Sequence, residues 1–183
     1  MKIKNLITNA MIKDLKPCKD RYDNYLHYYK DKAYTKAQFL GLRNISQNDK
    51  VWVSLRLMPK HNIALAAADI AESVLHIFEA EYPNDDRPRK AIAAARAGDK
   101  DKAHAAANAA SPTPHISSSV AASAQAAQVA TTASFAAYAA AHFLVANAAA
   151  SAASAAYVSS NAVTNKDKQE KLIRTIILKY WKE

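Results

Sequence analysis

Apolar side chains recur along this chain with the period of an α-helix, most clearly between residues 62 and 82. One stripe holds apolar residues at intervals of 4, 3, 4 and 3: Ile63, Ala67, Ile70, Val74 and Ile77. Pro83 follows, and a proline cannot continue the helical hydrogen-bond ladder because it has no N–H. The pattern therefore predicts a helix over 62–82 that ends before this proline.

Two shorter helices are expected next. Asp86 supplies a carboxylate that can cap the first of them, and Pro88 falls in its first turn, where a missing N–H does no harm. This helix should run to about Ala97, because Gly98 then breaks it. An Ala-rich helix over 100–110 should follow and stop at the two prolines of 111–114.

The stretch 115–160 contains neither Gly nor Pro and consists largely of Ala, the strongest helix former. It predicts one long helix or two collinear helices with a break near Asn147. A single helix of this length would measure about 68 Å at 1.5 Å per residue. Small side chains along such helices allow a close approach between their axes, so this stretch is interpreted as a packing scaffold and as a surface through which a homodimer could form.

The ends of the chain complete the helical pattern. The last segment, 166–182, carries an apolar stripe that must dock against other helices. The first third predicts helices over 3–15, 19–30 and 49–57, with a short strand at 51–53 as the alternative. We therefore expect an all-α fold, a single-domain helical bundle over 1–183. Its parts are basic helices over 1–60, central helices over 61–110, and Ala-rich helices with a C-terminal docking helix over 111–183.

Composition excludes several function classes. The chain has 41 alanines but only two glycines, so it cannot form a Walker loop or a dinucleotide-binding fingerprint. A single cysteine, Cys18, allows neither an internal disulfide nor a cysteine-based zinc site and fits a cytoplasmic location. The uncharged stretch 111–163 is rich in Ala and Ser rather than Leu or Ile, which argues against a membrane span.

Charge is concentrated in the first third of the chain. The net charge is +9, and residues 1–60 hold 13 Lys and Arg against 5 Asp and Glu. Tyrosines alternate with these cations, a pattern typical of nucleic-acid binding as well as of surfaces that attract acidic proteins. The residues predicted to bind a partner here are Lys16, Lys19, Arg21 and Tyr25. Cys18 shares a 4, 3, 4 stripe with three tyrosines, which favours a packing role for its thiol.

Acidic residues on the predicted helix 62–82 are the main candidates for chemistry. Asp69, Glu72, His76 and Glu79 share one face and could hold a hard cation or move a proton. Charged helix faces usually meet water, so we favour a solvated face. We assign no catalytic residue, no metal site and no cofactor, and expect a protein that is not an enzyme.

Four blocks of this sequence resemble the immunity proteins of the Imm5-like type. The blocks are Leu15–Cys18, Val51–Leu57, Ala67–Leu75 and Phe78–Ile92. The sharpest is the acidic run followed by Arg-Pro-Arg and a helix, which contains Asp86, Arg87 and Arg89; Asp69 lies in the third block. These four residues join the predicted partner-binding set, because exposed arginines often anchor interfaces. The neighbouring cap and proline favour a structural role for this block, in which the arginines clamp a carboxylate or carbonyl group of another helix.

The resemblance implies a cytoplasmic, non-enzymatic inhibitor that binds and occludes a toxin or effector protein, as in toxin–antitoxin pairs. The partner is then a protein, and no membrane is involved. The alternative is a nucleic-acid-binding or anti-defence protein that uses the basic, Tyr-rich first third.

Overall fold

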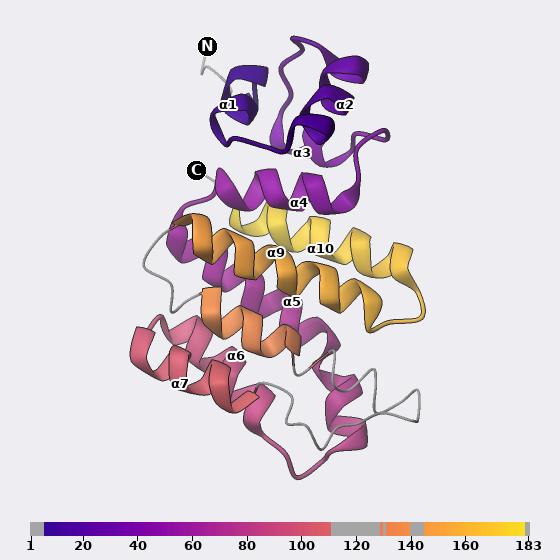
Figure 1. Cartoon of the computed structure of the whole chain (residues 1–183). Coiled ribbons are helices and arrows are strands. Elements are labelled where there is room, and N and C mark those ends of the chain that lie inside the picture. The colour runs from indigo at the N-terminus through magenta and orange to yellow at the C-terminus, as the bar shows by residue number, and fades with distance from the viewer. Residues whose placement is uncertain (1–5, 111–128, 130, 140–144, 182–183) are drawn as a thin grey trace.

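A computed structural model describes residues 6–110, 129, 131–139 and 145–181, and it is all-α, as the periodicity predicts (Figure 1). The helices are α1 (Asn9–Asp14), α2 (Lys19–Tyr29), α3 (Lys36–Leu40), α4 (Gln47–Arg56), α5 (Lys60–Glu81), α6 (Arg87–Ala97), α7 (Lys100–Ala110), α9 (Val145–Asn161) and α10 (Lys166–Tyr180). Residues 131–139 are also helical. None of the helices in these ranges is long and apolar enough to cross a lipid bilayer.

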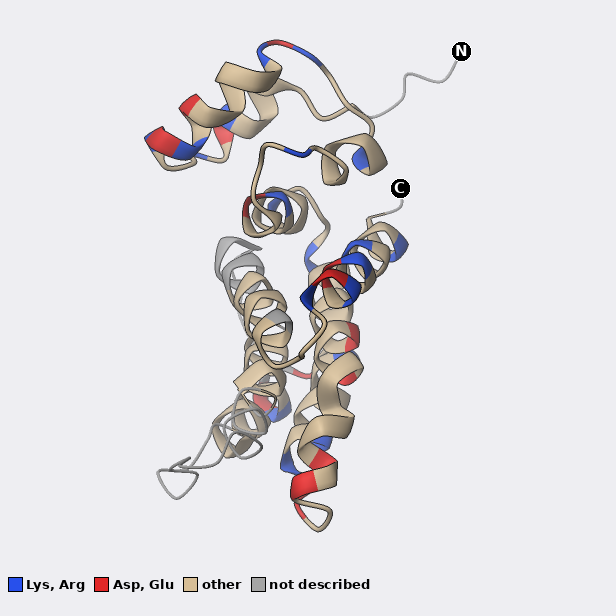
Figure 2. Ribbon diagram, turned by 90° about the vertical axis from the view of Figure 1, so that its right-hand side faces the viewer, with Lys and Arg blue, Asp and Glu red and all other residues tan. Residues whose placement is uncertain are grey.

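Helix α4 lies between two parts of the molecule. The short helices α1, α2 and α3 lie on one side of it, and the longer α5, α9 and α10 lie on the other, in both views (Figures 1 and 2). Helix α5 is central, since it packs against α6, α9 and α10. Trp181, just after α10, lies beside the first third of the chain, where its carbonyl oxygen accepts a hydrogen bond from the Lys36 ammonium at 2.7 Å.

One continuous core cluster runs from Ile7 to Trp181 and holds these parts together. Its middle is made of alanines on α5 and α9, among them Ala67 and Ala152, both fully buried. Because an Ala side chain is a single methyl group, these helices can approach to the near end of the usual 8–10 Å range. Larger side chains such as Phe39 fill the wider gaps, and Phe78 belongs to a second, smaller cluster with Val74, Val129 and Ala162.

The boundaries in the middle of the chain agree with the sequence signals. Helix α5 ends before Pro83, and α6 ends at Gly98, whose φ of 69° is the left-handed conformation that suits glycine. Asp86 occupies the N-cap position of α6 as expected, but its side chain makes no capping bond. The neighbouring Asp85 carboxylate accepts the Arg87 N–H at 3.1 Å instead.

The first third differs from its predicted form. The helix expected over 3–15 is confined to α1, because Ile7 is extended and pairs with Tyr34 in an isolated antiparallel bridge. Helix α3 was not predicted; Thr35 and Gln38 form a capping box at its start. The strand alternative at 51–53 is wrong, since Ser46 caps a helix that runs through these residues.

The Ala-rich stretch is only partly described, and much of the surface expected to support a homodimer lies outside the described residues. Within them, 131–139 and α9 are helical. Helix α9 begins at Val145 and passes through Asn147 without interruption, and residues 140–144, where a break beside Asn147 could fall, lie outside the described residues. Helix α10 packs against α3, α4, α5 and α9, so the predicted docking of the C-terminal helix is confirmed.

Candidate functional site

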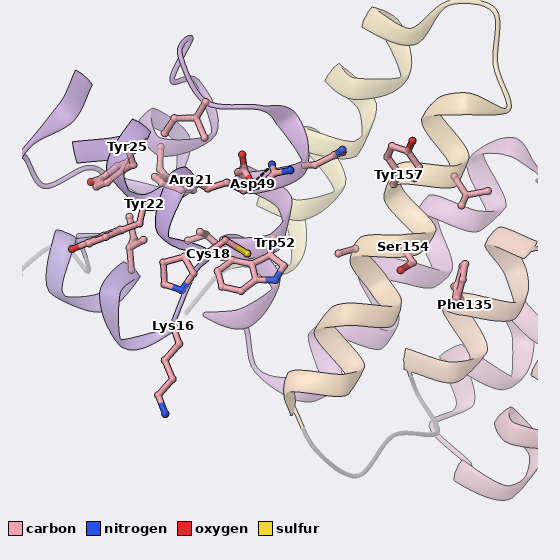
Figure 3. Close-up of a pocket in the computed structure, with 18 residues that line it drawn as sticks. Lys16, Cys18, Arg21, Tyr22, Tyr25, Asp49, Trp52, Phe135, Ser154 and Tyr157 are labelled. Carbon is pink, nitrogen blue, oxygen red and sulfur yellow. Dashed lines mark hydrogen bonds and ion pairs between the residues drawn. The ribbon is translucent and has the colours of Figure 1, made fainter. Parts of the chain in front are cut away.

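A cavity of about 610 Å³ opens beside α4, and we call it the α4 groove (Figure 3). Helix α4 forms its floor, the turn from α1 to α2 with α2 itself forms one wall, and α9 with Phe135 forms the other. Its lining residues are Ile12, Lys16, Pro17, Cys18, Arg21, Tyr22, Tyr25, Phe39, Ile45, Asn48, Asp49, Trp52, Val53, Phe135, Ala153, Ser154, Tyr157 and Val158. Three of the predicted partner-binding residues, Lys16, Arg21 and Tyr25, therefore meet in one place.

The turn between α1 and α2 directs Lys16 to the mouth of the groove. Lys16 has a φ of 54°, a left-handed conformation that is costly for a residue with a Cβ. Its side chain is exposed and extends away from the groove interior (Figure 3). Cys18 is also exposed, so the packing role expected from its spacing is wrong. It precedes α2 at the N-cap position, where its side chain makes no capping bond.

Aromatic side chains on the floor and on the α9 wall give the groove its apolar surface. Trp52 rises from the floor, and the Arg56 guanidinium lies 4.4 Å from the centre of its ring, which fixes the ring by a cation–π contact. Tyr157 stands on α9 with 53% of its surface exposed. Large aromatic side chains that remain open to solvent on a rigid helix are typical anchors of protein interfaces.

Tyr25 forms part of the wall rather than of the exposed rim. Only 3% of its surface is exposed, and its ring packs beside Tyr22 and Tyr29, with centroid distances of 6.4 and 5.9 Å. Burial, with smaller contributions from Tyr34, Tyr22 and Asp31, raises the pKa of its hydroxyl to about 12. Tyr25 therefore stays neutral and shapes the groove.

Polar contacts tie α2 to the rest of the molecule across the groove floor. Arg21 pairs with Asp49 of α4 at 2.7 Å, and Asp49 also accepts a hydrogen bond from the Ser46 hydroxyl at 2.6 Å. Asn24 donates to the Asn44 carbonyl oxygen at 2.9 Å. Lys19, the fourth predicted residue of this region, pairs with Asp23 on α2 and does not line the groove.

The other predicted partner-binding residues lie elsewhere and are engaged within the chain. Arg87 forms a two-pronged pair with Asp85, with a shortest distance of 2.6 Å, and donates to the Ala109 carbonyl oxygen of α7 at 3.3 Å. Arg89 donates to Glu79 of α5 at 2.8 Å. Asp86 pairs with Lys90 one turn further along α6 at 2.9 Å. The arginines thus clamp neighbouring segments, at the far end of the molecule from α2 (Figure 1).

Asp69 joins three helices. Its carboxylate accepts hydrogen bonds from Arg96 of α6 at 2.8 Å and from Lys179 and Tyr180 of α10 at 2.7 and 2.8 Å. Burial raises the pKa of the Asp69 carboxyl, but these bonds outweigh burial and hold it below its ordinary value. Glu72 also pairs with Arg96, and this contact lowers the pKa of Glu72. The solvated face expected here is therefore wrong for Asp69, which is part of an interhelical clamp.

The sequence did not identify Tyr157 and Trp52 as groove residues or Arg96 as a structural partner. The sequence predicts a helix that contains Trp52, but the residues around it do not indicate which face of that helix lines a groove. Tyr157 had one usable signal, since it is a large side chain in a run made almost entirely of Ala and Ser.

Within the described ranges, no group of three or more His, Cys, Asp or Glu side chains is placed to hold a metal ion. No protein-family model, curated protein or solved structure matches this chain.

Proposed function

We propose that this chain is a protein-binding inhibitor of the immunity type, which occludes a toxin or effector protein through the α4 groove and carries out no reaction of its own. On this proposal it acts in the cytoplasm. The observation that carries the proposal is the groove itself, an apolar hollow with an exposed Tyr157 and a half-buried Trp52 beneath a basic rim. The four sequence blocks that resemble immunity proteins support the same function, and two of them contribute to the groove: Leu15–Cys18 and Val51–Leu57.

The energetics favour the groove over the arginine block as the contact surface. An interface gains most from a few large, well-packed side chains at its centre, surrounded by contacts that exclude water. Trp52 and Tyr157 meet this description, whereas Arg87 and Arg89 would first have to leave partners that they already hold. Breaking such pairs would subtract from the binding free energy.

The basic first third supports the proposal because it would raise the rate at which the chain associates with an acidic protein. The excess of cations on 1–60 creates a positive field that would attract an acidic protein at a rate that falls as salt rises. Rim charges of this kind set how often partners meet, while the aromatic anchors set how long they stay together.

The test begins with purification of the chain from its native cells together with whatever protein it binds. The captured protein is then expressed in a test host with the wild type, with Trp52→Ala or with Tyr157→Ala. We expect the wild type to suppress the toxicity of the captured protein and the two groove variants to suppress it poorly. The matched control is Tyr28→Ala, because Tyr28 is similarly exposed at 48% but lies outside the groove.

Two outcomes would contradict the proposal. One is full protection by both groove variants. The other is tight binding of the purified chain to nonspecific DNA or RNA at about 150 mM salt, which would support the nucleic-acid alternative, since phosphate contacts weaken steeply as salt rises.

A further inference from the structure

We infer that the α4 groove receives a short amphipathic helix of the partner, which presents two large apolar side chains one turn apart and carries carboxylates along one flank only. This inference rests on the proposed function and specifies the chemistry of the partner. It follows from the length of the groove and from the unequal charge of its two walls.

The two walls differ in charge. The wall at the start of α2 contributes Lys16 and Arg21, whereas α9 holds no charged residue along its whole length (Figure 2). Arg21 is already paired with Asp49 at 2.7 Å. Lys16 forms no ion pair with any of the residues that the structure describes, and it is exposed at the groove mouth. A ligand with carboxylates on the flank that faces α2 therefore gains an ion pair with Lys16. Its other flank faces α9, which offers no charge to pair with, and needs no carboxylate.

The groove is short. Its lining on α9 runs from Ala153 to Val158 and its lining on α4 from Asn48 to Val53. Each run extends about 7.5 Å along its helix axis at 1.5 Å per residue. Side chains at positions i and i+4 of a bound helix stand about 5–6 Å apart, so two such anchors fit, whereas a third at i+7 would lie about 10.5 Å from the first and reach beyond the lining.

The anchors of the bound helix would contact Trp52 and Tyr157. Trp52 cannot easily turn aside, because Arg56 stacks on its ring at 4.4 Å. Tyr157 has 53% of its surface still to bury. A rigid aromatic floor and an open aromatic wall are the arrangement by which grooves between helices hold the apolar face of an added helix.

The probe is a designed, helix-locked peptide of about 14 residues, or roughly four turns, with leucines at i and i+4. Three versions carry glutamates, glutamines or lysines along one flank. Binding of each labelled peptide is followed by fluorescence anisotropy at about 150 mM salt, where exposed charges beyond roughly 8 Å are screened.

We expect the glutamate peptide to bind about threefold to fivefold more tightly than the glutamine peptide, as a rim ion pair contributes. Lys16→Glu should reverse the order and favour the lysine peptide. Lys32→Glu, which changes an exposed lysine outside the groove, should leave the order unchanged. Tyr157→Ala should weaken binding at least tenfold, as loss of an interface anchor does, and Tyr28→Ala should not.

Several results would overturn the inference. Equal affinity for the three peptides would refute the charged flank of the ligand. Equal peptide affinity of the wild type and Tyr157→Ala would refute binding in the α4 groove. A wild type that sediments as a dimer and becomes a monomer on Tyr157→Ala would show that a second copy fills the groove. Absence of peptide binding at roughly 1 mM, the weak limit of useful affinity, would also overturn it. The proposed function is judged separately, by protection from the captured protein.

Discussion

The left-handed backbone at Lys16 provides a test that separates stability from binding. A residue with a Cβ loses about 1–2 kcal/mol in this conformation, and glycine avoids the loss. Glycine also increases the conformational freedom of the unfolded chain, at a cost of about 0.5–1 kcal/mol. For the φ of 54° at Lys16, the change Lys16→Gly should therefore stabilise the fold by about 0.5–1 kcal/mol.

Urea unfolding followed by circular dichroism measures this change. We expect a higher midpoint with an unchanged dependence on denaturant, because the surface exposed on unfolding stays the same. The thermal midpoint should rise by about 1–4 °C, the range for a chain of this size. The same variant lacks the ammonium group at the groove mouth, so its affinity for the glutamate peptide should fall while its stability rises.

Lys30→Gly is the matched control, because Lys30 also has a positive φ, 46°, and is a lysine outside the groove. It should raise stability by at least as much, because the ψ of −129° at Lys30 lies in a region that mainly glycine adopts, and it should leave peptide affinity unchanged. A lower urea midpoint for both glycine variants would refute the argument from backbone strain. Equal losses of peptide affinity in both would refute the role of the Lys16 charge.

Three further changes test the packing of the helices. Asp69→Asn should cost about 1–3 kcal/mol in urea unfolding at neutral pH, because it weakens hydrogen bonds to a charged acceptor. The depressed pKa of Asp69 means that this difference is present above about pH 4 and shrinks as pH falls through the folded-state pKa, so a constant difference down to pH 2 would contradict it. Gly98→Ala should cost about 1 kcal/mol in thermal unfolding through its φ of 69° alone, since no atom lies within 4 Å of an added Cβ, and an unchanged midpoint would exclude this strain. Trp181→Ala should cost about 3–5 kcal/mol in urea unfolding, because Trp181 is 3% exposed and anchors α10, and a loss below about 1 kcal/mol would show that α10 docks without it.

The parts of the fold that could be predicted are those set by local sequence. The stripe of α5, the proline after it and the glycine after α6 act within a few residues of the boundaries that they define. Helix α3 was predictable in principle, since the Thr35 and Gln38 spacing is a capping signature, but five residues are too few for an apolar period to appear.

The groove could be predicted only in part, because it joins distant segments. Lys16 and Arg21 were found from local charge, whereas Trp52 and Tyr157 stand more than 100 positions apart and meet only through the packing of α4 against α9. The role of Asp69 was missed for the same reason, since its partners Arg96 and Lys179 lie on other helices. Periodicity identifies which residues share a face, but not which helix covers that face.

The position of α4 between the first helices and the larger body has a consequence for amide hydrogen exchange. Helix α2 buries only Tyr25 in the core and adds polar ties at Asp49 and Asn44, whereas ten residues of α5 are buried. Amides of α2 should therefore exchange through local openings at a much lower free energy than those of α5. A ligand that bridges α2 and α9 must be released before α2 can open, so its affinity would appear directly as slower exchange in the first thirty residues.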